Sequence, residues 1–375
     1  MRNFETHTVV NGIEAESVLD ALLGHLAEHE FVALRVDDAW ILDYESAQIK
    51  FAAKGDTLTA RITAPTSESL FDARMMAHHH IAEFANREQE VIAWEGDQPV
   101  FTRPPAFRVL TVTATYDVSP HMRRIRFHGD DLGRYERQED FHCKLLLPRP
   151  GNQAPEWPTL GPDGMPRFPT GEKRLDMRTY TIRRIDSKAG WMEIDFVLHD
   201  DAGPGADWAA QACPGQQIGV TGPGGRTARP SAWMLLAADE TGLPAIARIA
   251  ENLPHETRGE ILIEVQGPAD EISLTVPGGM QLRWLHRNDQ APGTSTLLRD
   301  AILASAIPDV EDRFAWVAAE FSTAQTVRKW LRDTVGMIGK DQLVVAYWRL
   351  GMDEMTMKRG GRRTEEGEAA EKAAE

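Results

Sequence analysis

The chain has 375 residues, of which 42% are hydrophobic and 26% charged, a composition typical of globular proteins with two or three domains. Its apolar stretches are too short to span a bilayer, the N-terminus lacks an apolar signal core, and two cysteines cannot form a disulfide framework. The net charge of −16 argues against nucleic acid or anionic membrane as a partner. These features predict a cytoplasmic protein with no integral membrane segment.

The acidic charge is concentrated in the first 97 residues, which hold 7 Lys or Arg and 18 Asp or Glu. The apolar spacing predicts a helix over residues 15–29 and a second helix that begins near Thr66 or Ser67. Strands are predicted between them over residues 31–36, 40–42, 49–52 and 58–62. This order indicates a small acidic α+β domain over residues 1–97, followed by a linker over residues 98–106.

From Phe107 the apolar period changes to two, which is typical of strands. Strands are predicted over residues 109–115, 122–127, 141–147 and 191–199. Because no helix of 12 or more residues is expected before Gly205, the pattern favours an antiparallel β-barrel over residues 107–229. The segment 148–176 contains seven prolines and is predicted to be an irregular loop of that barrel.

After Arg229 short apolar strands alternate with helices. The predicted strands cover residues 233–238, 261–265, 314–319 and 343–348, and the predicted helices cover residues 244–253, 294–306 and 323–335. Such alternation indicates a parallel sheet with helices on both faces, an α/β domain over residues 230–353. The highly charged segment 354–375 is predicted to be disordered.

Residues 178–183, Arg-Thr-Tyr-Thr-Ile-Arg, match the flavin-binding pattern Arg-x-Tyr-Thr-x-Arg. A guanidinium can bind a pyrophosphate bidentately, and Tyr180, two residues along a strand, lies on the same face as Arg178 and can lie against an isoalloxazine ring. Thr181 can offer a hydroxyl or backbone group near flavin N5. For this hexapeptide alone, a basic edge strand is the other interpretation.

Two further segments can present backbone N–H groups to phosphate oxygens. Residues 195–209 combine a strand, a Gly-Pro turn and the start of a helix, and residues 237–246 join a strand to a helix that Thr241 could cap. The chain has no Gly-x-Gly-x-x-Gly, which argues against a dehydrogenase-type Rossmann domain.

Five segments in this order resemble the siderophore-interacting protein family, which includes the vibriobactin-utilisation proteins. The segments are residues 178–183, 195–209, 215–224, 239–246 and a C-terminal pair at 317–320 and 347–351. The resemblance covers about residues 107–353. The sequence departs from the family pattern at Ala319, where Gly is frequent, at Gly242, where Ala is frequent, and at Asp200, where Gly commonly follows His.

The resemblance implies a ferredoxin-reductase-like arrangement, with FAD in the barrel domain and NADH or NADPH at the Rossmann-like α/β domain. It implies reduction of ferric iron in a siderophore complex, by a monomer or weak dimer. The cofactor-binding residues it implies are Arg178, Tyr180, Thr181, Arg183, Val197, His199, Gly203, Pro204, Trp208, Ala209, Thr221, Asp239, Glu240 and Thr241. The basic residues it offers for an anionic substrate are Arg248, Arg328, Lys329 and Arg349.

Electron transfer of this kind needs no general acid, so no side chain is predicted to act in proton transfer. Two alternatives remain open. One is a flavoprotein reductase with another electron acceptor. The other is a siderophore carrier, without enzymatic activity, on the same fold.

Two histidine patterns in the acidic domain raise the question of a metal site. His25 and His29 fit His-x-x-Glu-His, and His78, His79 and His80 are consecutive on the second predicted helix. The first pair lacks a third ligand, and a regular helix spreads three consecutive residues over different faces. No metal site is therefore predicted. This domain resembles an uncharacterised small family, and a lid, a dimerisation element and a docking module stay open as its role.

Overall fold

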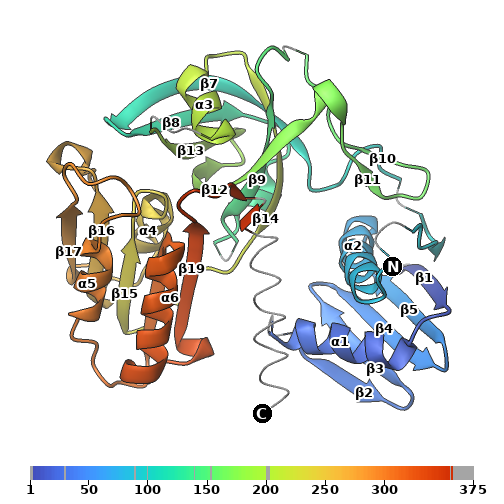
Figure 1. Cartoon of the computed structure of the whole chain (residues 1–375). Helices are drawn as coiled ribbons and strands as arrows, with labels where there is room; N and C mark the ends of the chain where they lie inside the picture. Colours follow the sequence, from blue (N-terminus) through green and yellow to red (C-terminus); the bar gives the residue numbers. More distant parts are fainter. Residues whose placement is uncertain are drawn as a thin grey trace. The chain divides into compact units, whose positions relative to one another are not determined.

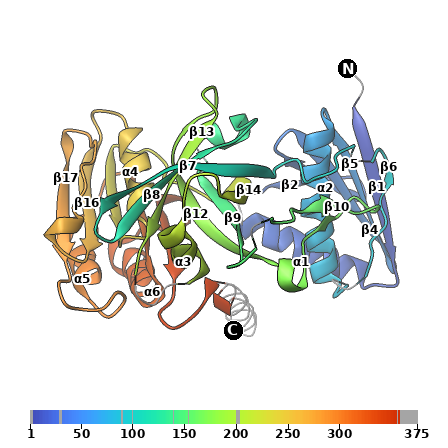
Figure 2. The same cartoon turned by 90° about the horizontal axis from the view of Figure 1, so that it is seen from above.

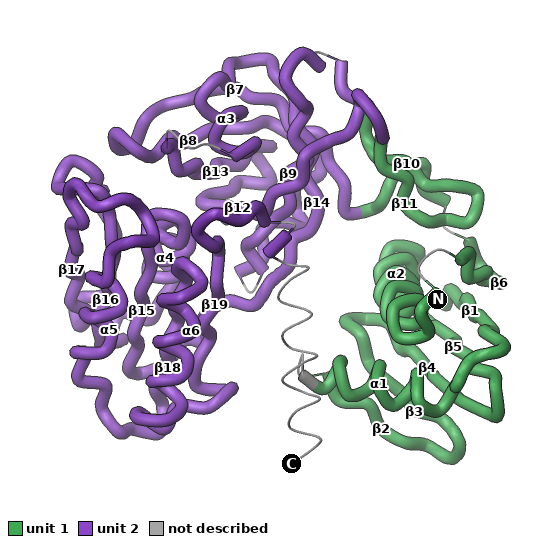
Figure 3. The backbone as a smooth tube through the Cα atoms, in the orientation of Figure 1, with its two compact units in different colours: residues 1–105, 156–169 green, residues 106–155, 170–375 purple. Residues whose placement is uncertain are grey.

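A computed structural model describes residues 3–28, 31–87, 90–98, 100–138, 140–152, 154–199, 203–354 and 356–357. The chain folds into two compact units (Figure 3). Unit 1 comprises residues 1–105 and 156–169, and unit 2 comprises residues 106–155 and 170–375. The predicted disordered segment 354–375 lies almost entirely outside the described residues.

Unit 1 contains a six-stranded sheet with the order β2-β3-β4-β5-β1-β6, in which all neighbouring strands are antiparallel (Figures 1 and 2). Its strands are β1 (Phe4–Asn11), β2 (Ala33–Val36), β3 (Ala39–Tyr44), β4 (Ala47–Lys54), β5 (Thr57–Ala64) and β6 (Glu95–Gly96). The apolar pattern predicted β2 to β5 but not β1. Two of the inward residues of β1 are the buried Thr6 and Thr8. Their hydroxyls donate hydrogen bonds to backbone carbonyls, which allows these polar groups to be buried.

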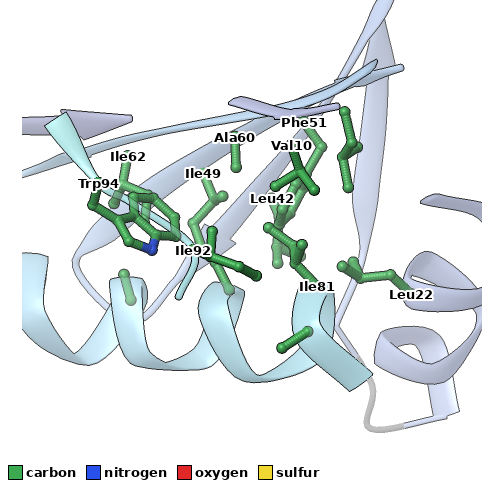
Figure 4. Packing of buried hydrophobic residues seen from close by; sticks show 14 of the residues in the cluster. Val10, Leu22, Leu42, Ile49, Phe51, Ala60, Ile62, Ile81, Ile92 and Trp94 are labelled. Atoms are coloured by element: carbon green, nitrogen blue, oxygen red, sulfur yellow. The ribbon is translucent and has the colours of Figure 1, made fainter. Parts of the chain in front are cut away.

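Two helices cover one face of this sheet (Figure 1). They are α1 (Ala15–Glu28) and α2 (Ser67–Phe84), as the sequence predicted. Leu22 and Ile81 from the helices pack with Leu42, Ile49 and Phe51 from the sheet (Figure 4). Of the two residues near which the second helix was predicted to begin, Thr66 is the N-cap, because its hydroxyl accepts a 3.1 Å hydrogen bond from the backbone N–H of Ser69.

The segment 156–169 belongs to unit 1, although the sequence placed it in a loop of the barrel. It forms a two-stranded hairpin, β10 (Thr159–Leu160) with β11 (Pro166–Arg167). Met165 enters the unit 1 core, and the Gly164 carbonyl accepts a 3.0 Å hydrogen bond from the buried guanidinium of Arg74 on α2. The prediction of an irregular barrel loop is therefore wrong for this segment: the prolines keep the two strands short, and the hairpin completes the fold of unit 1.

The first part of unit 2 is a closed antiparallel barrel with the strand order β12-β13-β8-β7-β14-β9. Its strands are β7 (Arg108–Ser119), β8 (Met122–His128), β9 (His142–Pro148), β12 (Leu175–Asp186), β13 (Trp191–Val197) and β14 (Gln217–Gly224). Alternate residues such as Leu110, Phe127, Leu145, Ile182 and Ile194 fill its interior. The predicted barrel is confirmed.

The second part of unit 2 is a five-stranded parallel sheet with the order β17-β16-β15-β18-β19. Its elements are β15 (Trp233–Ala238), α4 (Leu243–Glu251), β16 (Arg258–Val265), β17 (Gly279–His286), α5 (Leu297–Leu303), β18 (Arg313–Glu320), α6 (Phe321–Trp330) and β19 (Gln342–Trp348). Helix α4 packs on one face, and α5 and α6 pack on the other, as predicted (Figure 1). Strand β17 was not predicted, because the connection from β16 contains a short 3-10 turn in place of a helix.

The barrel and the parallel sheet share a continuous apolar junction. Met122 and Phe141 of the barrel join a buried cluster that contains residues of β15, β16, β18 and α4. Polar contacts extend this junction, because Asp270 accepts hydrogen bonds of 3.0 Å from the Ser119 hydroxyl and 3.1 Å from the His121 backbone. A shared core of this kind holds the two parts in one arrangement.

Candidate functional site

Strand β12 carries the predicted flavin motif, and its pairing with β9 fixes the direction of each side chain. Tyr180 is opposite Cys143, and Thr181 is opposite His142. Cys143 and Ile182 are buried in the barrel core, so Tyr180 faces the barrel and Thr181 faces the α/β domain. The motif therefore presents different groups on the two sides of one strand.

The Arg178 guanidinium lies half-buried near the start of β12. Within the described part of the chain its hydrogen bond goes to the neighbouring Met177 carbonyl, at 2.8 Å, and it forms no ion pair. Most of its donors are therefore available to an anion. This state fits the predicted role of Arg178 in binding a pyrophosphate.

The Tyr180 ring is held between the barrel and helix α3 (Pro204–Gln211). Its centroid lies 4.4 Å from that of Phe196, which in turn lies 6.0 Å from the Trp208 ring. The Tyr180 hydroxyl contacts the α carbon of Gly205, where an added Cβ would overlap it. Burial raises the pKa of Tyr180, so the phenol stays protonated and can donate a hydrogen bond.

The first turn of α3 offers backbone donors that suit a phosphate. Gly203 is the N-cap and makes no side-chain hydrogen bond, Pro204 follows it, and a Cβ at Gly203 would meet no atom within 4 Å. The backbone N–H groups at the start of a helix lack intrahelical partners and carry partial positive charge. Together with Arg178 and Tyr180, this turn forms a cradle whose donors fit the pyrophosphate and the ring of FAD.

Thr181 lies beside His142, where the barrel meets the α/β domain. Thr181 is buried, and His142 Nε2 is 2.6 Å from the hydroxyl of Tyr347 on β19. Burial, together with the nearby charge of Arg248, lowers the pKa of His142 to about 4. At neutral pH the imidazole is therefore uncharged.

Two arginines among the predicted site residues are instead held by the protein. Arg183 forms a bidentate ion pair with Glu251 of α4, at 2.6 and 2.8 Å. Arg248 is 4% exposed, donates to the backbone carbonyls of Ile182 and Arg137 at 2.6 and 2.7 Å, and lies over the Phe141 ring. Burial lowers the pKa of Arg248 to about 10. Both side chains join the barrel to α4.

Buried carboxyl groups line the carboxyl end of β15. Asp239 accepts hydrogen bonds from the backbone N–H and hydroxyl of Thr241, at 2.9 and 2.5 Å, and from the Trp348 indole at 2.8 Å. Glu240 forms an ion pair with Arg287, and burial beside Asp239 raises the pKa of Glu240 to about 7. Thr241 does not cap α4, whose N-cap is Gly242.

Gly242 brings the start of α4 close to the ends of the strands. A Cβ at this position would lie 2.6 Å from the Ala238 Cβ and 3.1 Å from the Ala318 Cβ. The crevice outside the carboxyl ends of parallel strands is where such sheets bind nucleotides. The acceptors of Asp239 and Glu240 suit ribose hydroxyls, and Arg287, whose Nη1 pairs with Glu240, keeps a buried Nε without a hydrogen bond in the described structure.

The remaining predicted residues are distributed over several elements. Arg328 and Lys329 are exposed on α6, with Arg328 donating to the Val344 carbonyl, and Arg349 is exposed and lies over the Phe321 ring. Val197 joins the apolar junction, His199 is exposed, and Thr221 pairs with Lys144. Ala209 is fully buried in the barrel core, so only its backbone can contact a ligand.

Two family models match successive parts of unit 2. Residues 111–227 match the siderophore-interacting FAD-binding domain, and residues 231–351 match the siderophore-interacting protein model. The chain is also 30% identical over 252 residues to the ferric vibriobactin reductase ViuB of Vibrio cholerae, which covers 66% of this chain and 91% of that protein. The chain belongs to the siderophore-interacting protein family. Its barrel is the FAD-binding domain of this family.

Other siderophore-interacting proteins and reductases are similar over the same region. The NADPH-dependent ferric-chelate reductase of Escherichia coli is 33% identical over 220 residues, which is 57% of this chain and 82% of that protein. The crystal structure of a siderophore utilization protein from T. fusca matches with a TM-score of 0.60 and 36% identity, over 66% of this chain and 94% of that one. Residues 7–95 match a family of uncharacterized proteins conserved in bacteria.

The histidine patterns of unit 1 do not form a metal centre in the described residues. His25 lies against His80, with ring centroids 5.1 Å apart, and His78 Nδ1 accepts a hydrogen bond from the Trp94 indole. No group of three or more His, Cys, Asp or Glu is arranged around an ion in this part of the structure, and His29 lies outside it. None of the described helices is long and apolar enough to cross a membrane.

The sequence did not predict which residues form hydrogen bonds or ion pairs with the site residues. His142 stands between apolar Phe141 and Cys143, a signal for the outward face of a strand, but its register with Thr181 depends on tertiary pairing. Tyr347 was part of a recognised segment without an assigned role. Glu251, which holds Arg183, follows no pattern that marks it among the acidic residues of the chain.

Proposed function

We propose that this chain is a cytoplasmic ferric-siderophore reductase that uses FAD and takes electrons from NADH or NADPH. The observation that carries this proposal is the cradle formed by Arg178, Tyr180 and the open first turn of α3. Membership of the siderophore-interacting protein family and similarity to proteins named as ferric reductases support the same activity.

The residues of the barrel bind and orient the flavin in this proposal. Arg178 and the backbone N–H groups after Gly203 bind the pyrophosphate, because both have hydrogen-bond donors that are available to an anion. Tyr180 supports the ring system, and Thr181 lies on the buried side that faces the α/β domain. Val197, His199 and Thr221 border the same end of the barrel as further contacts.

The α/β domain receives the electron donor beside the start of α4. Asp239 orients Thr241 and Trp348, and Glu240 with Arg287 supplies an acceptor and a cation at the ends of the strands. When bound, FAD accepts a hydride from the reduced nicotinamide and releases the electrons one at a time to Fe(III). The apolar junction keeps water away from the transfer.

The ferric complex is the substrate, and its negative charge favours an exposed basic surface. Arg328, Lys329 and Arg349 supply exposed cations, and we assign the substrate contacts to this set. We assign neither Arg248 nor Arg183 to the substrate or cofactor contacts, because their buried guanidinium groups already form hydrogen bonds with protein partners. Reduction releases iron because hard oxygen ligands hold Fe(II) less tightly than Fe(III).

An absorption spectrum of the purified full-length chain, before and after reconstitution with FAD, tests the proposal. NADH or NADPH is then added without oxygen, followed by the ferric complex of a catecholate or a hydroxamate siderophore. We expect flavin bands that bleach with a nucleotide and return with a ferric siderophore. Arg178→Gln should lose FAD, whereas the matched control Arg299→Gln, on a partly exposed residue of α5, should retain it.

Two outcomes would redirect the assignment. Reoxidation by ferricyanide but by neither ferric siderophore would indicate a reductase with another acceptor. A protein that binds ferric siderophores but takes up no FAD would indicate a carrier.

A further inference from the structure

Among the described residues, the hydrogen bond between His142 and Tyr347 links the flavin-motif side of the barrel to the last strand of the α/β domain. His142 begins β9 directly opposite Thr181, and its Nε2 lies 2.6 Å from the hydroxyl of Tyr347 near the end of β19. Elsewhere the described junction combines the polar contacts of Arg183, Arg248 and Asp270 with an apolar cluster. His142 and Tyr347 are both part-buried, and a polar pair in such surroundings depends largely on the bond between its two partners.

Both rings are held in defined orientations. The Tyr347 ring meets His142 edge-on, with centroids 5.7 Å apart and an interplanar angle of 87°. The Tyr347 ring also meets Trp316 at a steep angle, with centroids 6.2 Å apart and an interplanar angle of 88°. Tyr347 therefore has little freedom to rotate, and its hydroxyl fixes the direction of the imidazole.

The protonation of the pair follows from this environment. Burial lowers the pKa of His142 and raises the pKa of Tyr347, so the imidazole is neutral and the phenol is protonated at neutral pH. A phenol that donates to Nε2 leaves the imidazole proton on Nδ1. The pair allows this direction, and in the tautomer that it creates Nδ1 is the free donor of the imidazole.

Nδ1 has no hydrogen-bond partner in the described structure. It faces the α carbon of Gly225, where a Cβ would lie 3.0 Å from it, and Gly225 has a φ of +85° that favours glycine. The turn thus leaves room around Nδ1 that any other residue would fill. His142 Nδ1 is therefore an available hydrogen-bond donor on the same strand face as Thr181.

We propose that His142 is a flavin-contacting residue that donates a hydrogen bond from Nδ1 to the isoalloxazine of FAD, and that Tyr347 is the positioning residue that holds it. This inference rests on the proposed function, since it requires FAD in the barrel. It gives the α/β domain a direct influence on the flavin, because Tyr347 belongs to that domain. If the bond between Tyr347 and His142 is broken, FAD binding should weaken, although every residue that contacts the flavin is still present.

Two substitutions of His142 separate its two nitrogen atoms. The side-chain amide of Gln reaches about as far as Nε2, so His142→Gln can keep the bond to Tyr347 while it loses the Nδ1 donor. The amide of Asn reaches about as far as Nδ1, so His142→Asn can keep the donor while it loses Tyr347. Tyr347→Phe removes only the hydroxyl, and Tyr116→Phe, whose hydroxyl bonds to Glu193 on the barrel, is the matched control.

The measurements are thermal unfolding, the dissociation constant of FAD, and the visible flavin spectrum of the reconstituted full chain. We expect His142→Gln to raise the FAD dissociation constant about three- to tenfold, the value of one lost hydrogen bond. It should also shift the flavin band, whereas its melting temperature stays near that of the wild type. His142→Asn should bind FAD more tightly than His142→Gln but melt at a lower temperature.

The single variants His142→Leu and Tyr347→Phe each leave one polar group without its partner and should lower the melting temperature. The double variant removes both polar groups and should restore the melting temperature. Its flavin spectrum should remain altered. Recovery of both properties, or a His142→Gln protein that binds FAD and absorbs like the wild type, overturns the inference and leaves the proposed function standing. A wild-type chain that takes up no FAD overturns the proposed function and this inference with it.

Discussion

Replacement of Arg248 by Met separates a role in the junction from a role in substrate binding. The basic residues of the chain do not differ in sequence in any way that marks this one as buried. In the structure Arg248 is 4% exposed and its guanidinium joins α4 to backbone carbonyls on two barrel segments. We therefore expect the substitution to destabilise unit 2 and to leave the preference among electron acceptors unchanged.

The size of the effect follows from three lost contacts. Each hydrogen bond from a charged donor to a buried carbonyl contributes about 1.5 kcal/mol. The contact with the Phe141 ring, whose centroid lies 5.3 Å from the guanidinium carbon, adds about 1 kcal/mol. A loss of about 4 kcal/mol lowers the melting temperature of a unit of this size by about 8 °C.

Circular dichroism during heating measures this loss, and steady-state kinetics with a ferric siderophore and with ferricyanide measure the acceptor preference. Arg258→Met, on an exposed residue of β16, is the matched control and should change stability by no more than about 0.5 kcal/mol. An Arg248→Met protein that melts like the wild type but has a higher KM for the ferric siderophore alone would refute this reasoning. It would restore Arg248 to the substrate site.

Three further changes test other parts of the structure. Gly205→Ala places a Cβ against the Tyr180 hydroxyl and should weaken FAD binding about tenfold in a fluorescence titration, whereas Gly133→Ala, whose Cβ meets no atom within 4 Å, should not. The raised pKa of Glu240 means that the folded state holds this proton more tightly than the unfolded state, so stability falls as pH rises from about 4.5 through about 7. Glu240→Gln should remove about 3 kcal/mol of this decline in chemical denaturation, and an unchanged slope would show that another group causes it. Deletion of residues 1–97 should make the segment 156–169 sensitive to protease, because it loses its core partners, and a short Gly/Ser replacement of that segment should restore resistance.

Patterns of local spacing predicted most elements of the fold. The helices of unit 1, four of the six barrel strands and the alternation of the α/β domain follow from apolar periodicity, which can be read from the sequence without tertiary contacts. Strand β1 was missed because Thr6 and Thr8 are buried polar residues, and their burial depends on carbonyls that lie 89 and 85 residues away. Strand β17 was missed because its crossover lacks the helix that usually separates parallel strands.

The candidate site was only partly predictable, for a related reason. The flavin motif is a contiguous hexapeptide, so its chemistry can be read from neighbouring residues. The partners that decide what each group can do come from distant segments, as Glu251 does for Arg183 and Tyr347 does for His142. The sequence shows that Arg183 and Arg248 carry positive charge, but it does not show that their guanidinium groups already form hydrogen bonds with other parts of the protein.

The place of the segment 156–169 in unit 1 has a topological consequence for proteolysis. The chain passes between the two units at three points, after residues 105, 155 and 169. A single cut in the linker 98–106 therefore cannot release unit 1, because the hairpin that contributes Met165 to its core still continues into unit 2 on both sides. Separation of the two units requires cuts on both arms of the hairpin as well, so one nick should leave a complex that runs as a single species until it is denatured.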